Sequence, residues 1–493
     1  MDQDTSTPSQ QFSRAEDIAL ILTTCIISAL LIYLVYLRSF VFGSVLGNWV
    51  DPYLSSVPVF PRWVPLIVLS SLGLLVFLGS KLIHSHERIT LLVLFLFAFC
   101  TQSLIRKIYP FSLGTIVQSD GANSFYTPAL SYSTVEILSK FITLAPLLPL
   151  HAKANMPGKI LLFELLRLIT ASPETMGYLI IFLSSLGTLL LYGICKRLFQ
   201  NKLIAFYAAT LYILLPGKLF FLPILNTVTP VLMLLCFYLF VIYLDTKNLW
   251  ISLLLGVSGY ILILFEPSPL ITGVVLIGIL IHAIREKRFS SRDFYRLVTY
   301  SSLGFLIMFI LFYALFSFNI FQSFFYILKE QQNFISSYER GYLIWIIENS
   351  KDFYYGAGIP VMILFIYATA LIFVQTKNLK NIAQWPLESI FTISILVTFL
   401  LLLFLGINRG EVIRLWIYLA VLFQIPASIF IAKIKKGGGS VLPCCKHVGD
   451  SNHGYFASGW LYKTLITYHH IKLRQTVAAL LTRISLENRR VQA

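Results

Sequence analysis

One aspartate stands apart from the long apolar segments of this chain. Asp120 lies in the stretch QSDGANSFYTPALSYS, residues 118–133, among small, polar and aromatic residues. A carboxylate beside a membrane can act as a general base and take the proton from an incoming hydroxyl group. Asp120-Gly121 is also a common turn dipeptide, so the same residues fit a structural role.

Basic residues follow Asp120 in a segment that suits the binding of a phosphate. His151, Lys153 and Lys159 lie in HAKANMPGK, residues 151–159. Lysine presents a fixed positive charge to an anionic leaving group, and histidine adds a hydrogen-bond partner. The alternative for Lys159 is that its ammonium group extends to lipid headgroups while its stem stays in the apolar phase.

A second cluster lies at the start of the last apolar segment, in INRGEVIRLWIY. It contains Arg409, Glu411 and Arg414. An arginine inside an apolar span is costly and is functional by default, so we expect Arg414 to meet a lipid phosphate. Glu411 and Arg414 are three residues apart and can pair on one helix face, which is the structural alternative. Glu266, in the segment EPSP between two apolar runs, would face the same cavity or belong to a tight turn.

The composition places these residues in a membrane protein. The chain has 493 residues, of which 57% are hydrophobic and 12% charged. Runs of about 20 apolar residues recur, and each can cross ~30 Å of hydrocarbon. The sequence therefore predicts an all-α polytopic membrane protein. The net charge of the chain is +16. Lys and Arg residues concentrate in the cytoplasmic loops of membrane proteins, which accounts for this charge, so no nucleic-acid partner is expected.

The apolar runs predict about twelve spans. The shortest, 203–217, ends at Pro216-Gly217, a natural turn. The predicted spans are 18–37, 62–80, 89–106, 177–195, 203–217, 219–244, 249–265, 268–284, 297–317, 357–375, 389–407 and 412–432. They give a short N-terminal segment, 1–17, a transmembrane domain, 18–433, and a tail, 434–493, for which no role is predicted.

Every second connection between spans is basic. The basic residues lie in KRLFQNK, in REKRFSSRDFYR, at Lys377 and Lys380, and from Lys433 onward. The positive-inside rule places these connections and both termini in the cytoplasm. Two long loops, 107–176 and 317–356, then lie on the outer face, and loops of that length are usually functional.

The first long loop carries helix signals. Ser133-Thr-Val-Glu136 is a capping-box pattern, and Ser172-Pro173 is typical of the start of a helix. Between them, Pro157-Gly158 precedes KILLFELLRLIT, which is too short and too charged to span comfortably. This segment predicts a helix lying at the membrane surface.

Residues from Gln118 to about Leu244 resemble the GT-C superfamily of membrane glycosyltransferases. The resemblance rests on SDGANSFYTPAL, on LHAKANMPGKILLFELL, and on LLLYGICKRLFQNKLIAFYAATLYILLPG. It implies transfer of a sugar from a polyprenyl-phosphate carrier to a lipid, glycan or protein, on the outer face of a bacterial inner membrane. Asp120 would then be the catalytic base. Lys153, Lys159 and Arg414 would contact phosphate.

The chain departs from that family in two motifs. It has one proline, Pro157, where two are usual, and NTVTPVL where many members carry an acid. The acceptor and any dependence on a divalent metal therefore stay open, and no metal ligands are predicted. In the tail, Cys444 and Cys445 suit acylation better than zinc, because CC-x-H lacks the usual ligand spacing.

Two rival functions remain at this stage. A polysaccharide polymerase or ligase also has about twelve spans, and its essential residues would lie in the loop 317–356. A transporter or lipid flippase would show matching broken helices with charges at mid-membrane. The charged residues gather at the outer surface instead, which favours a transferase that works with membrane lipids.

Overall fold

The computed structural model describes residues 14–36, 42–47, 49–50, 63–107, 111–376 and 385–435. By its internal contacts the chain divides into residues 1–443 and 444–493. The basic connection at Lys377 and Lys380, the cysteines of the tail, and most of both predicted terminal segments lie outside the described residues.

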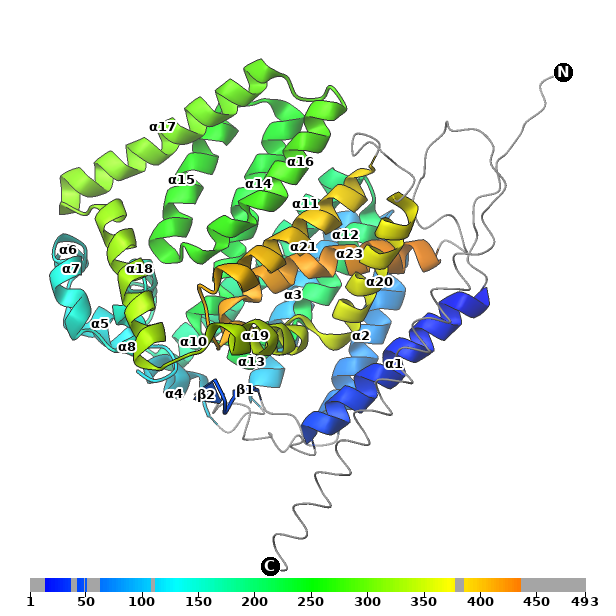
Figure 1. Ribbon diagram of the computed structural model, residues 1–493, viewed down its shortest axis with the longest axis horizontal. Coiled ribbons are helices and arrows are strands. Elements are labelled where there is room, and N and C mark those ends of the chain that lie inside the picture. Colours follow the sequence, from blue (N-terminus) through cyan, green and yellow to red (C-terminus); the bar gives the residue numbers. More distant parts are fainter. Residues whose placement is uncertain are drawn as a thin grey trace, which may run out of the picture. The chain divides into compact units, whose positions relative to one another are not determined.

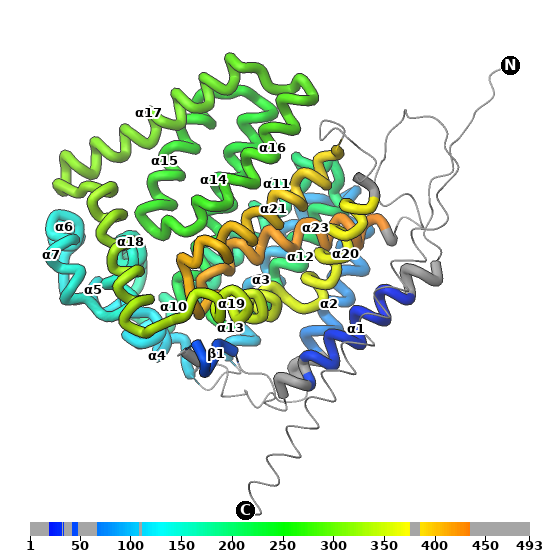
Figure 2. Tube along the Cα trace, viewed as in Figure 1, coloured from blue at the N-terminus to red at the C-terminus, as the bar shows by residue number. Residues whose placement is uncertain are grey.

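The described residues are helical apart from one short antiparallel ladder. In it β1 (Gly43–Ser44) pairs with β2 (Trp49–Val50). The helices, shown in Figure 1 and traced as a tube in Figure 2, are α1 (Arg14–Tyr36), α2 (Trp63–Leu82), α3 (Glu87–Lys107), α4 (Leu113–Gln118), α5 (Tyr126–Ser131), α6 (Thr134–Ser139), α7 (Phe141–Leu144), η1 (Ala145–Leu147), α8 (Leu150–Lys153), α9 (Gly158–Arg167), α10 (Pro173–Ser185), α11 (Gly187–Phe199), α12 (Lys202–Ile213), α13 (Pro216–Phe221), η2 (Leu225–Thr227), α14 (Thr229–Thr246), α15 (Leu249–Phe265), η3 (Ser268–Thr272), α16 (Gly273–Arg285), α17 (Ser291–Phe316), α18 (Ile320–Ser337), α19 (Tyr342–Ala357), α20 (Ile359–Thr376), α21 (Leu387–Leu405), α22 (Val412–Leu415) and α23 (Ile417–Lys435).

The all-helical, multi-pass character is confirmed, but the predicted count of about twelve spans is not. Seven helical segments of the described chain are long and apolar enough to cross a membrane. They are Glu87–Lys107, Pro173–Phe199, Lys202–Phe221, Leu225–Thr246, Ser268–Arg285, Ser291–Phe316 and Leu387–Leu405. An eighth is reached only if α19 and α20, bent by 109° at their junction, form one span. The other predicted spans coincide with shorter apolar helices, in α1, α2, α15 and α23.

The turn predicted at Pro216-Gly217 lies just before these residues, at Leu214-Leu215, where α12 ends. Pro216 opens α13, and the apolar segment continues to Phe221. Proline suits the first position of a helix, because its fixed backbone angle is helical and that position needs no N–H. The segment that begins at Lys202, capped by the Asn201 side chain, is therefore longer than the sequence predicts.

The innermost helix is α23. Most of its described side chains are buried, and it packs against α12, α14, α20 and α21. α17 lies at one edge of the bundle, where it packs against α15 (Figure 1). The two backbones approach closely at Gly256, where a Cβ atom would lie only 1.9 Å from the Ser301 carbonyl oxygen. Small residues allow this close packing between apolar helices.

The predicted helices of the first long loop are present. Ser133 and Glu136 form the expected capping box at α6, and Ser172 caps α10 with Pro173 at its first position. The second long loop forms α18 and α19. Asp352 of α19 is buried and accepts the Gly43 N–H at 3.0 Å, which attaches β1 to this helix.

Candidate functional site

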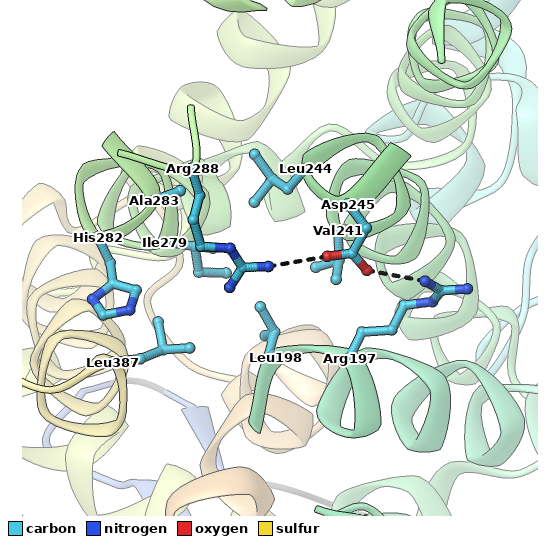
Figure 3. A pocket seen from close by; sticks show the side chains of 10 residues that line it. All are labelled: Arg197, Leu198, Val241, Leu244, Asp245, Ile279, His282, Ala283, Arg288 and Leu387. Atoms are coloured by element: carbon cyan, nitrogen blue, oxygen red, sulfur yellow. Dashed lines mark hydrogen bonds and ion pairs between the residues drawn. The ribbon is translucent and has the colours of Figure 1, made fainter. Parts of the chain in front are cut away.

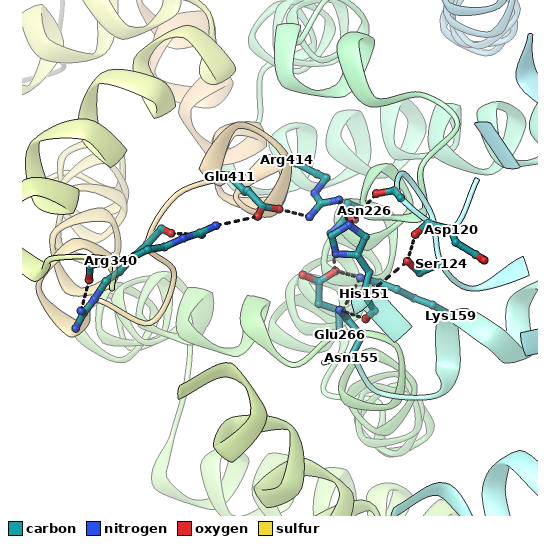
Figure 4. A network of polar contacts seen from close by, with 12 residues as sticks. Asp120, Ser124, His151, Asn155, Lys159, Asn226, Glu266, Arg340, Glu411 and Arg414 are labelled. Carbon is teal, nitrogen blue, oxygen red and sulfur yellow. Dashed lines mark hydrogen bonds and ion pairs between the residues drawn. The ribbon is translucent and has the colours of Figure 1, made fainter. Parts of the chain in front are cut away.

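Side chains from both long loops and from several span ends form one polar network (Figure 4). The contributing segments are 120–124, 151–159, 226–229, 266–268, 340 and 409–414. Every candidate from the sequence lies in one of these segments. The contacts differ in kind, however, and they divide the candidates into a buried ion pair, a cationic cluster and an exposed acid.

The buried ion pair joins Lys159 to Glu266. Lys159 Nζ lies 2.8 Å from Glu266 Oε2, and the two side chains are only 1% and 6% exposed. Burial lowers the pKa of Lys159, and the facing carboxylate opposes that effect. Burial would raise the pKa of Glu266, but Lys159 holds it below its ordinary value. The 2.8 Å contact pairs the two groups, and each opposes the effect of burial on the other.

The chain brings these two residues together through a glycine. At Gly158 an added Cβ atom would lie 2.5 Å from the Leu264 carbonyl oxygen. Only glycine lets the start of α9 approach the end of α15 this closely. Glu266 also accepts hydrogen bonds from Thr229 Oγ1 at 2.7 Å and from Ser268 Oγ at 2.9 Å. The pair therefore fixes α9 against the ends of α14, α15 and η3.

His151 links this pair to the cationic cluster. Lys159 Nζ donates to Asn155 Oδ1 at 3.0 Å, and Asn155 Nδ2 donates to the His151 carbonyl at 2.8 Å. His151 Nε2 lies 3.0 Å from the Gly121 carbonyl oxygen and 3.4 Å from Arg414 NH1. In the neutral ring this nitrogen cannot both donate to the carbonyl and accept from the guanidinium.

The charge state of His151 follows from its surroundings. Burial disfavours the imidazolium, and the Arg414 guanidinium repels it. Together they lower the pKa of His151 to about 4. The ring is therefore neutral near pH 7.

The cationic cluster contains two arginines that share one acid. Arg414 NH2 binds Glu411 Oε2, which is the structural alternative for these two residues, and Arg340 NH2 lies 3.6 Å from Glu411 Oε1 (Figure 4). Arg340 and Arg414 are 4% and 6% exposed. Burial would raise the pKa of Glu411, but the positive charge of Arg414 keeps it below its ordinary value. Two buried guanidiniums therefore meet at one carboxylate.

Arg409 supports the cluster from the side of α19. Its NH1 donates to the Arg340 carbonyl at 2.6 Å. The neighbouring Gly410 N–H donates to Asn349 Oδ1 at 3.0 Å, and Asn349 Nδ2 donates to the Asn408 carbonyl at 2.7 Å. The segment that positions Glu411 and Arg414 is therefore held by the second long loop.

Asp120 is the exposed acid beside the network. Its carboxylate accepts a hydrogen bond from Thr127 Oγ1 at 2.8 Å, and its backbone carbonyl accepts one from Ser124 Oγ. Ser124 Oγ in turn accepts the His151 N–H at 3.3 Å. The Asp120 side chain extends away from His151 in Figure 4. The segment thus joins the network through its backbone and leaves the carboxylate at the surface.

Lys153 points to a different partner. Its Nζ lies 3.3 Å from Glu330 Oε2 of α18. This contact ties the first long loop to the second. It does not place the Lys153 ammonium against Arg414.

The sequence prediction did not include Ser124, Asn155, Arg340 and Asn349 in the site. For Arg340 a signal was available, because it lies in the long loop 317–356 beside aromatic residues. The other three are short polar residues whose positions depend on contacts between distant segments.

The residues of the network do not fit a metal ion. Within the described part of the chain, no group of three or more His, Cys, Asp or Glu side chains is placed to hold one. Glu266 and Glu411 are already paired with cations. No protein-family model matches the chain, and no curated protein matches it.

Proposed function

We propose that this chain is a membrane glycosyltransferase that moves a sugar from a polyprenyl-phosphate carrier to a hydroxyl of a lipid, glycan or protein. The observation that carries the proposal is that two buried guanidiniums, of Arg340 and Arg414, meet at Glu411, and that His151 links Arg414 to the segment of Asp120. We place the reaction on the extracytoplasmic face of a bacterial inner membrane, because the basic connections lie at the other ends of the spans.

Arg414 and His151 bind the donor phosphate in this proposal. Buried guanidinium groups form strong, charge-assisted hydrogen bonds with phosphate oxygens. They also stabilise the negative charge that grows on the phosphate as the sugar departs. Lys159 acts indirectly, because Glu266 already compensates its charge. It positions His151 through Asn155.

Asp120 is the base in this proposal. It is the network's exposed acid, whereas Glu266 and Glu411 are held by cations. The acceptor hydroxyl gives its proton to the Asp120 carboxylate and its oxygen bonds to the anomeric carbon. The bond from that carbon to the phosphate oxygen breaks, and polyprenyl phosphate leaves. A single displacement of this kind inverts the anomeric centre and needs one carboxylate.

The proposal is tested in membranes supplied with radiolabelled polyprenyl-phosphate sugars. The wild-type chain should transfer label to lipid, glycan or protein. Arg414→Gln should weaken donor binding about 10- to 100-fold, because a hydrogen bond to a charged group contributes about 1.5–3 kcal/mol. Lys140→Gln removes an exposed charge from the same loop and should behave as wild type. Absence of transfer by the wild-type chain with every donor would refute the proposal.

Donor binding should become tighter as the pH falls from 7.5 to 5. Free His151 has a pKa of about 4, and a bound phosphate raises that pKa, so binding takes up a proton in this window. The phosphodiester itself keeps one charge throughout. Titration of the purified chain with donor at the two pH values measures the effect. His151→Gln should remove most of the pH dependence, and an unchanged slope in this variant would exclude His151 from the phosphate site.

A polysaccharide polymerase or ligase is the second candidate, and one observation favours it. Arg340, from the loop 317–356, shares Glu411 with Arg414. The size of the labelled product separates the two candidates. A transferase adds single sugars, whereas a polymerase or ligase yields products that carry long chains.

A further inference from the structure

A pocket with one charged edge lies at the other ends of the helices that carry the network. α14 connects the two places, because Thr229 at its start binds Glu266 and Asp245 near its end lines the pocket. Sixteen residues of helix separate them by roughly 24 Å. The pocket is lined by Arg197, Leu198, Val241, Leu244, Asp245, Ile279, His282, Ala283, Arg288 and Leu387 (Figure 3).

The charged edge holds two arginines and one acid. Arg197 NH1 lies 2.9 Å from Asp245 Oδ2, and Arg288 NH2 lies 3.4 Å from Asp245 Oδ1. Figure 3 shows the two guanidiniums reaching Asp245 from opposite sides, with His282 beside the same hollow. One positive charge is left over, and each guanidinium keeps donors that Asp245 does not use.

The remaining lining is apolar. Leucine, valine, isoleucine and alanine side chains from α11, α14, α16 and α21 form it. These positions lie at the ends of apolar helices, where lipid headgroups meet hydrocarbon. A ligand that meets this edge needs a phosphate for the two guanidiniums, and its acyl chains would lie in the surrounding hydrocarbon rather than in the small pocket itself.

We infer that this pocket binds an acidic membrane phospholipid through its phosphate. Basic pockets between membrane helices are suited to acidic headgroups. One phosphodiester would neutralise the single excess charge of Arg197, Arg288 and Asp245. The inference is independent of the proposed transferase activity, because it uses a different end of the bundle and none of the same residues.

The test uses the full chain in nanodiscs that contain phosphatidylglycerol and phosphatidylcholine in equal amounts. Native mass spectrometry after mild delipidation counts the lipids that stay bound. Wild type should retain phosphatidylglycerol. Arg197→Gln and Arg288→Gln should each reduce its retention about 10-fold, a loss in line with one charged hydrogen bond. Arg292→Gln, in the same basic region but exposed and outside the pocket, should retain it fully.

Asp245→Asn should change phosphatidylglycerol retention in the opposite direction. It removes the competing carboxylate while keeping its shape, so it should increase phosphatidylglycerol retention. This result does not depend on a variant that loses function through misfolding. Equal retention of phosphatidylglycerol in all variants, or equal retention of phosphatidylcholine by wild type, would overturn the inference. Glycerol phosphate alone should not displace the lipid. Displacement by it would mean that the pocket recognises a soluble phosphate.

Discussion

Asp120→Asn is expected to lower the rate of sugar transfer by about 10²- to 10⁴-fold, the range in which general base catalysis contributes. The amide cannot accept a proton from the acceptor hydroxyl. It can still accept the hydrogen bond from Thr127 Oγ1, so the local fold should survive. The donor phosphate is bound elsewhere, by Arg414 and His151, so donor binding should stay unchanged. Transfer rate and donor affinity, measured side by side at matched expression, check both statements.

Two controls separate chemistry from folding in this prediction. Thr127→Val removes the hydrogen bond to Asp120 but keeps the carboxylate, and it should reduce the rate far less than Asp120→Asn. Asp120→Glu keeps the charge and displaces it, so a partial loss is expected. Equal transfer by wild type and Asp120→Asn would make Asp120 a turn residue only. The base would then have to be Glu266 or Glu411, after release from its cation.

Local spacing was enough to predict several features of this chain. The capping box at Ser133 and Glu136 and the ion pair of Glu411 with Arg414 both join residues three positions apart. In each pair the first residue is the N-cap that precedes the helix and the second lies in its first turn, so the local backbone brings the two side chains together. The all-helical class followed from apolar run length in the same way.

Contacts between residues far apart in the sequence could not be predicted from local spacing. His151 meets Arg414 across 263 positions, and Arg340 meets the Arg409 segment across 69. The sequence predicts that both clusters lie on one face of the membrane. It does not predict which of their residues are in contact. It therefore treated Lys159 and Glu266 as separate candidates, although they form one buried pair.

The predicted number of about twelve spans is not confirmed, for a related reason. Hydropathy measures apolar length, and it does not detect how a helix is bent. α19 and α20 meet at Gly358 with a bend of 109°. The predicted span 357–375 is therefore not a straight continuation of the helix that comes before it. In α23 the apolar stretch is shorter, Ile417–Lys433, and most of its side chains are buried in protein.

Lys159→Met is expected to destabilise the fold by about 3–5 kcal/mol, the usual cost of removing one partner of a buried ion pair. Glu266 would be left charged and buried beside Thr229 and Ser268. The methionine itself should pack well, because Lys159 lies between the rings of Phe125 and Phe265. A chemical unfolding titration of the purified chain measures the loss. Lys140→Met, at an exposed position, is the matched control and should change stability little.

The double variant Lys159→Met with Glu266→Gln isolates the cause. The amide oxygen can still accept from Thr229 and Ser268, and no buried charge remains, so most of the lost stability should return. Recovery of folding would not bring full activity, because Asn155 would lose the Lys159 donor and His151 would be held less firmly. If the double variant is no more stable than Lys159→Met, the pair is not stabilised by charge compensation. If it recovers both stability and full transfer, the pair only holds the fold and does not position His151.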